Sequence, residues 1–153
     1  MSKIKTFRGL LEDGGQDTIY LAGDLPADGY RIKNLTIMGE RPGAETYESI
    51  VQVFSVKQSV VGGVINFDDD SLLASAYYES NSGAGSLPFY TMSIVDHVVV
   101  NQNIYVTHSE VNGSNPINYQ LELEQIKMSK GEQAVANFKA ALLHTEWALQ
   151  FTT

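Results

Sequence analysis

Short runs of apolar and β-branched residues alternate along this chain with clusters of glycine, proline, asparagine and aspartate. The runs recur roughly every ten residues, which is typical of a β-sandwich or a β-barrel. The separators suit turns, because glycine tolerates a positive φ and proline fixes its own φ. The pattern predicts an all-β antiparallel chain with strands near residues 4–11, 17–22, 29–38, 46–57, 62–67, 88–95, 98–107 and 117–128.

Two segments, residues 49–56 and 97–106, are apolar on both faces of the predicted strand. A strand with one face in water alternates apolar and polar residues, so these segments need a cover on each face. One cover is the core of the sandwich. The other is a loop or the C-terminal helix of the same chain, or a neighbouring subunit, and the pattern leaves these alternatives open.

The run at residues 117–128 changes its phase near its end. Apolar residues occupy every second position from Tyr119 to Leu123, and the next apolar residue is Ile126. One extra residue in a strand produces such a slip, so we predict a β-bulge between Leu123 and Ile126 that turns the chain out of the sheet. Glu122 and Glu124 are then expected on a solvated face.

Two segments have helical features. Residues 68–80 open with aspartates that can cap a helix and continue with apolar residues at helical spacing, although the segment also suits a strand. The second segment follows residue 128, where Ser129 and Glu132 match a capping box and residues 133–150 contain no glycine or proline. We expect a C-terminal helix there.

The expected C-terminal helix has two apolar stripes. The first has the 3-4 spacing of a coiled coil and comprises Val135, Phe138, Leu142, Thr145 and Leu149. The second comprises Leu143, Trp147 and Phe151. Either the helix packs on its own sandwich, or its aromatic end docks on another subunit, because large aromatic side chains often anchor interfaces. We therefore divide the chain into a sandwich domain, residues 1–128, and a helix and tail, residues 129–153, that belongs to the same domain or docks on a neighbouring subunit.

Composition and charge narrow the class of protein. The chain has 153 residues, 43% of them hydrophobic and 18% charged, which suits one globular domain without disulfides, since cysteine is absent. The net charge is −8 and the cations are scattered, so the surface would repel nucleic acid and anionic membrane. No apolar run approaches the roughly 18 residues of a spanning helix, and the first residues do not match a signal peptide. We expect a soluble protein that is made in the cytoplasm.

The sequence contains no motif for catalysis or for a cofactor. The histidines lie in separate predicted elements, at His97, His108 and His144, which argues against a zinc site. The best metal candidates are three consecutive acids, Asp68, Asp69 and Asp70. They lack the alternating ligands and the closing glutamate of a calcium loop, so we expect a turn or capping role, with a structural cation as the alternative. Nucleophile-elbow and phosphate-binding glycine motifs are missing, and we predict no cofactor, no metal and no enzymatic activity.

Three segments together resemble a known family. They are "GGQDTIYLAGDLPADGYRIKNLTIMGERPG" at residues 14–43, "VINFDDDSLLASAYYES" at residues 64–80 and "NQNIYVTHSEVNGSNPINYQLELEQIKMS" at residues 101–129. These segments resemble small virion structural proteins of marine tailed bacteriophages. The resemblance spans most of the chain before the C-terminal helix, and it rests on strands and turns, with no catalytic residues to carry over.

The resemblance implies a virion component assembled in the host cytoplasm. A chain of charge −8 is poorly suited to face packaged DNA, so we expect a capsid decoration (cement) protein on the outside of the shell. It would be a jelly-roll-like sandwich and a homo-oligomer, with a trimer favoured, that contacts the major capsid protein or other virion proteins. Multivalent attachment would raise its avidity for the shell. The predicted subunit or shell contacts are Phe138, Leu142, Leu143, Trp147 and Phe151.

The alternative is a receptor- or glycan-binding module of a tail fibre or spike. Sugar sites in sandwiches use exposed aromatic side chains beside polar loops. A glycine- and serine-rich loop is flanked here by Tyr77, Tyr78, Phe89 and Tyr90. These four residues are the predicted ligand-binding positions for that alternative.

Overall fold

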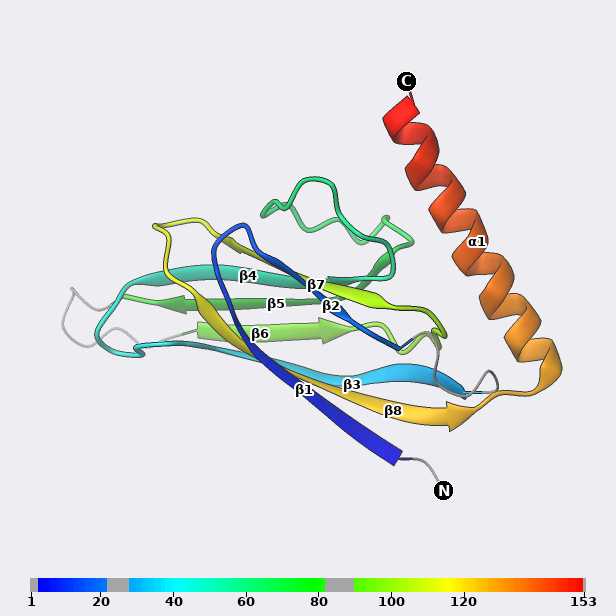
Figure 1. The fold of residues 1–153 in the computed structure, drawn as a ribbon. Helices are drawn as coiled ribbons and strands as arrows, with labels where there is room; N and C mark the ends of the chain where they lie inside the picture. The colour runs from blue at the N-terminus through cyan, green and yellow to red at the C-terminus, as the bar shows by residue number, and fades with distance from the viewer. Residues whose placement is uncertain (1–2, 22–27, 82–89, 153) are drawn as a thin grey trace.

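The computed structural model describes residues 3–21, 28–81 and 90–152, with side chains described up to residue 143 except at position 140. Two antiparallel sheets pack face to face as a sandwich, and one helix follows the last strand (Figure 1). The strands are β1 (Lys3–Leu11), β2 (Gln16–Ile19), β3 (Asp28–Gly39), β4 (Tyr47–Phe54), β5 (Leu72–Ser80), β6 (Tyr90–Val95), β7 (Ile104–Glu110) and β8 (Ile117–Lys127). The helix is α1 (Lys130–Thr152). The predicted antiparallel β-sandwich with a C-terminal helix is confirmed.

One sheet has three strands in the order β1-β8-β3, and the other has five in the order β2-β7-β4-β5-β6. Their inner faces enclose a continuous apolar core in which Val51, Val53, Ile104, Leu121 and Leu123 are fully buried. Alternation along β8 explains this, because every second side chain of a strand points to the same face. The core is closed by residues of one chain.

Strand β4 is buried on both faces, as its sequence predicted, and the outer cover is a loop of the same chain. Residues 55–71 cross the outer face of β4 (Figure 1). The Gln52 side-chain amide donates a hydrogen bond to the Val64 carbonyl over 3.1 Å, which ties the loop to the strand. The strand predicted at residues 62–67 is therefore wrong. Gly63 lies in this covering loop, where a Cβ would come within 3.3 Å of Ile50 Cδ1 of β4, so a glycine allows the close approach.

The helix considered for residues 68–80 is wrong, and the strand alternative is correct. A turn precedes β5, in which Asp69 Oδ1 accepts hydrogen bonds from the Ser71 amide at 2.9 Å and from the Ser71 hydroxyl at 2.7 Å. The aspartate thus shapes a turn. Strand β5 then lies between β4 and β6, and Ala76 and Tyr78 point into the core. Pairing on both edges outweighs the helical preference of this alanine-containing segment.

The β-bulge predicted between Leu123 and Ile126 is wrong, and in the β3–β8 pair the irregularity lies in β3 instead. The register shift falls between Ile32 and Asn34, and β8 pairs with β1 without interruption up to Gln125. Gln125 occupies an inward position and its side-chain amide donates to buried Asp28 Oδ2 over 2.5 Å. Gln125 is a hydrogen-bonded polar residue at an inward-facing position. In the sequence, it therefore looks like a break in the alternation of apolar and polar residues.

Glu124 also differs from the expectation of a solvated face. Its side chain is only 13% exposed, and it contacts Arg31 at 3.1 Å and Lys33 at 3.3 Å. Hydrogen bonds from Arg31 and then Lys33 lower the pKa of Glu124, because they favour its ionised form. The outer face of β8 is therefore a partly covered, ion-paired surface at this point.

Helix α1 begins with the predicted capping box. The Glu132 amide donates to Ser129 Oγ over 3.2 Å, and the Ser129 amide donates to Glu132 Oε1 over 3.4 Å. The helix then runs beside the sandwich and ends away from both sheets (Figure 1). No helix in the described part of the chain is long and apolar enough to cross a membrane.

Candidate interaction surfaces

The helix α1 presents the described part of its first apolar stripe, Val135, Phe138 and Leu142, to solvent. The exposed fractions are 66% for Val135, 71% for Phe138 and 48% for Leu142. These values are high for apolar side chains on one face of an amphipathic helix, because such a face is normally buried. The outward face of α1 is thus an apolar surface with no cover from the described residues of its own sandwich.

The opposite side of α1 leans towards the sandwich. Ala136, Lys139 and Leu143 line a cavity of about 250 Å³ between the helix and the sheet layer. The side chain of Asn101, from the segment before β7, donates a hydrogen bond to Asn137 Oδ1. This side therefore supplies the contacts of α1 with its own chain.

The predicted contact residues divide between these two sides. Phe138 and Leu142 lie on the outward face, whereas Leu143 is half-buried over the cavity. The side chains of Trp147 and Phe151 lie outside the described residues. Among the described side chains, the first stripe faces solvent and the start of the second stripe, Leu143, faces the sandwich. Helical spacing alone did not show which stripe would face outward.

The predicted aromatic ligand positions are also divided. Tyr78 is 3% exposed and packs edge-on against Tyr47 in the core, so it is not part of a surface. Tyr77 and Tyr90 lie together on the outer face of β5 and β6, with ring centroids 6.1 Å apart. Phe89 lies outside the described residues. Two of the four positions are thus shown to form one surface.

The hydroxyl of Tyr77 is engaged by carboxylates. It donates to Glu79 Oε2 at 3.1 Å and lies 3.4 Å from Glu48 Oε1. Partial burial, followed by the hydrogen bond to Glu79 and the charge of Glu48, raises the pKa of Tyr77 to about 12. The phenol therefore stays protonated and acts as a hydrogen-bond donor at neutral pH.

Strand β6 is an exposed apolar edge. Tyr90, Met92 and Ile94 point to the outer face and are each exposed by 47–49%. The strand contains no charged residue. Charges on an edge strand discourage pairing with other chains, so β6 lacks this protection.

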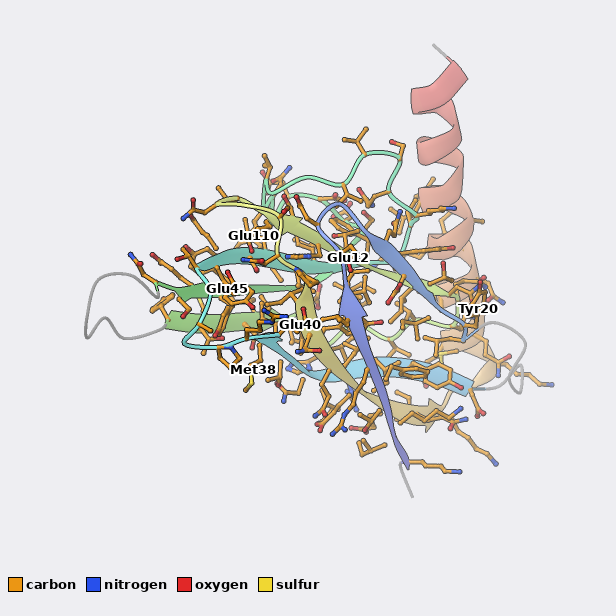
Figure 2. All side chains as sticks on the ribbon, turned by 60° about the vertical axis from the view of Figure 1, so that its left-hand side comes forward. Glu12, Tyr20, Met38, Glu40, Glu45 and Glu110 are labelled. Carbon is orange, nitrogen blue, oxygen red and sulfur yellow. The ribbon has the colours of Figure 1, made fainter. Side chains whose placement is uncertain are left out.

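The end of the sandwich away from α1 is acidic. Figure 2 labels Glu12, Glu40, Glu45 and Glu110 at this end, on or beside the turns that join the strands. Glu110 differs from the other three because it is buried, and it accepts hydrogen bonds from the Glu48 amide and the Ser49 hydroxyl, both at 2.6 Å. Its position makes it a structural acceptor between β4 and β7.

The histidines whose side chains are described have structural positions. His108 is fully buried with Nδ1 at 2.9 Å from the Leu11 carbonyl, and His97 Nδ1 lies 3.1 Å from the Ile32 carbonyl. The side chain of His144 is outside the described residues. Within the described residues, no three acidic or histidine side chains come together as a metal site, and the candidate acids at 68–70 do not form one.

The sequence was compared with protein-family models and with curated proteins. No protein-family model matches the chain, and no curated protein matches it. The candidate sites are therefore the outward face of α1, the apolar edge at β6 and the Tyr77–Tyr90 pair, taken on their own geometry.

Proposed function

We propose that the protein is a phage virion structural protein, namely a capsid decoration (cement) protein that stabilises the shell through contacts made by several copies. The observation that carries the proposal is the outward face of α1, where Val135, Phe138 and Leu142 are exposed. The sandwich core is complete without this face. An apolar surface left outside a complete core favours contact with other proteins.

The class of partner comes from the resemblance of residues 14–43, 64–80 and 101–129 to virion structural proteins of marine tailed phages. Charge supports an exterior position. The net charge is −8, and the end of the sandwich away from α1 carries glutamates (Figure 2). Such a surface repels packaged DNA, so the proposed partner is the outer surface of the major capsid protein or another virion protein.

Strand pairing supports a jelly-roll-like description of the sandwich. A jelly roll is a long antiparallel ribbon wrapped around a core, in which the first and last strands pair and the inner strands pair in turn. The pairs β1–β8, β2–β7 and β4–β5 follow this scheme. Strand β6 departs from it, because it pairs with β5 instead of β3.

The proposed mechanism is multivalent attachment, with a trimer as the assembly. Each copy contributes a modest apolar contact, and linking copies makes later contacts intramolecular, which raises the effective concentration. A ligand that binds only the assembled shell also stabilises it by mass action. The shell would then resist heat and internal pressure better with the protein bound.

Co-sedimentation of the purified protein with DNA-free shells of the phage that encodes it tests the proposal. We expect saturable binding at a fixed number of copies per shell and a higher disruption temperature for decorated shells. Raising the salt to about 0.5 M is expected to release little protein if apolar contact dominates, because salt screens charge pairs and not apolar contacts. A lack of saturable binding would overturn the proposal.

A receptor- or glycan-binding tail module is the second candidate, and the Tyr77–Tyr90 pair is the observation that favours it. Sugars stack on aromatic faces of this kind. Binding of a defined glycan on an array, lost in Tyr90→Ala, would support this candidate. Shell binding with no glycan binding would support the decoration protein.

A further inference from the structure

We propose that the outward face of α1 packs against the same face of a second copy of this chain, with the two helices parallel. The face is formed by Val135, Phe138 and Leu142, and we refer to these three residues as the seam. The inference deepens the proposed function, because it assigns this face to contact between copies of the proposed oligomer and leaves contact with the shell to other exposed apolar residues, such as Tyr90, Met92 and Ile94 of β6. In a trimer of parallel helices, each pair of neighbouring helices makes this contact. It depends on the helix alone and needs no property of the shell.

The seam lies on a long helix that receives little support from its own sandwich. Helix α1 has 23 residues, or about 35 Å of length. Isolated helices are marginal in water, and most helical stability in proteins comes from packing an apolar face. The described contacts with the sandwich lie on the other side, at Ala136, Asn137 and Leu143, so the seam is open for a partner.

The spacing of the seam favours a second copy as the partner. Val135, Phe138 and Leu142 are separated by three and four residues, and the sequence continues this spacing at Thr145 and Leu149. Two helices with this repeat insert each side chain between four of the other helix, so the repeat is complementary to itself. A helix that binds a groove on an unrelated protein uses the same spacing over about two turns, so the continuation of the spacing to Leu149 is what favours a second copy.

The columns that flank the seam are compatible with parallel self-pairing. Ala134 and Ala141 lie one heptad apart on one side, and Glu132 and Lys139 lie one heptad apart on the other. In a parallel pair, each flanking column meets the opposite column of the second copy. The charged column then faces alanines, so like charges do not meet across the seam.

The area sets the strength that we expect. An aromatic side chain buries about 150–250 Å² on association, and the three seam residues together offer roughly 300 Å² per copy at exposures of 48–71%. A standard stable interface buries about 800 Å² per partner. The seam is under half of this, so association should depend on concentration and should use the full length of the helix.

Sedimentation equilibrium of the full chain tests the inference. We expect a mass above the 16.8 kDa of one chain, rising with protein concentration. Phe138→Glu should weaken association by at least about 30-fold, since central apolar anchors contribute about 2 kcal/mol or more. The control is Val60→Glu, because Val60 is an exposed apolar residue on the covering loop, at 79% against 71% for Phe138, and does not line the cavity beneath α1. This control should associate like the unmodified chain.

Three results would contradict the inference. These are a monomeric unmodified chain at all concentrations, a Phe138→Glu variant that still associates, and loss of association in Val60→Glu alone. Far-ultraviolet circular dichroism of each variant establishes that the sandwich is folded. If the protein does not co-sediment with shells, the masses from sedimentation equilibrium are unaffected. The two experiments therefore test the proposed function and the helix contact independently.

A cysteine cross-link tests the parallel orientation independently. The chain contains no cysteine, so Leu142→Cys introduces a single thiol. A parallel pair in register places residue 142 beside its own copy, and mild oxidation should give a disulfide-linked dimer in high yield. Val60→Cys, at a 79% exposed site on the covering loop, should remain largely monomeric. Equal yields from the two variants would overturn the parallel seam.

Discussion

The buried carboxylate of Glu110 offers a quantitative test of how the acidic end of the sandwich is held together. The side chain is 7% exposed. It accepts hydrogen bonds from the Glu48 amide and the Ser49 hydroxyl, both at 2.6 Å, and from the Asn112 amide at 3.2 Å. Among the described residues, no cation forms an ion pair with it. Hydrogen bonds alone therefore offset the cost of burying this charge.

Two substitutions separate the hydrogen bonds from the charge. In Glu110→Ala, the Glu48 amide and the Ser49 hydroxyl lose their acceptor, whereas the exposed Asn112 amide turns to water. A buried donor without an acceptor costs about 1–3 kcal/mol. The Ser49 hydroxyl bond is buried and the Glu48 amide bond is only partly buried, so we expect a total loss of about 2–4 kcal/mol. In Glu110→Gln, the remaining oxygen still accepts from the amides and the serine hydroxyl can reverse its role. Neutral hydrogen bonds are weaker than those to a carboxylate, but the variant no longer buries a charge. The free energy of unfolding should therefore change by no more than about 1 kcal/mol.

Urea unfolding monitored by circular dichroism measures both free energies of unfolding, and Glu12→Ala, at an exposed site near the same end, serves as the control. Glu110→Ala should also lower the melting temperature by roughly 4–16 °C, at about 2–4 °C per kcal/mol for a chain of this size. The control should change the free energy of unfolding by less than about 0.5 kcal/mol. The reasoning would be refuted if Glu110→Ala lay within 1 kcal/mol (roughly) of the unmodified chain, or if Glu110→Gln cost as much as the alanine variant.

Three further substitutions test individual contacts. Glu124→Gln should reduce stability at neutral pH, because hydrogen bonds from Arg31 and Lys33 lower the pKa of this carboxyl. The stabilisation is present above the unfolded pKa and is lost as pH falls through the lower folded pKa, so the urea midpoints of the two chains should converge in acid. Tyr77→Phe should remove one phenol that ionises near pH 12, and the difference in absorbance between the two chains should detect this loss. Because the pKa of Tyr77 is raised in the folded protein, the group stabilises the fold below pH 10, and this stabilisation is lost as pH rises towards 12. Tyr119→Phe should cost about 1.5–3 kcal/mol in urea unfolding, because Asp17 Oδ2 loses a donor at 2.8 Å, and an unchanged midpoint would contradict that contact's importance.

Features that depend on neighbouring residues could be predicted from the sequence. Strand and turn alternation, the burial of every second residue up to Leu123, and the capping box of Ser129 with Glu132 all follow from local geometry. The two-sided burial of β4 was also visible, because apolar residues occupy positions on both faces of this segment. These predictions needed no knowledge of which strands meet.

The errors occurred where the outcome depends on partners far along the chain. Residues 72–80 form a strand because β4 and β6 pair with it. The apparent bulge near Gln125 is a polar side chain hydrogen-bonded to Asp28, 97 residues away. Local preferences are worth only tenths of a kcal/mol per residue, so pairing on two edges or one buried hydrogen bond outweighs them. No window of neighbouring residues contains that information.

The same division applies to the candidate interface. The sequence by itself determined that α1 carries two apolar stripes, since helical spacing follows directly from the order of residues. Only the tertiary structure decided which stripe faces outward, with Leu143 turned to the sandwich and Phe138 to solvent. That choice depends on the direction in which the chain leaves β8 and on contacts such as Asn101 with Asn137. The rotation of a helix about its axis is set by the surface against which it packs, and that surface exists only once the strands have paired.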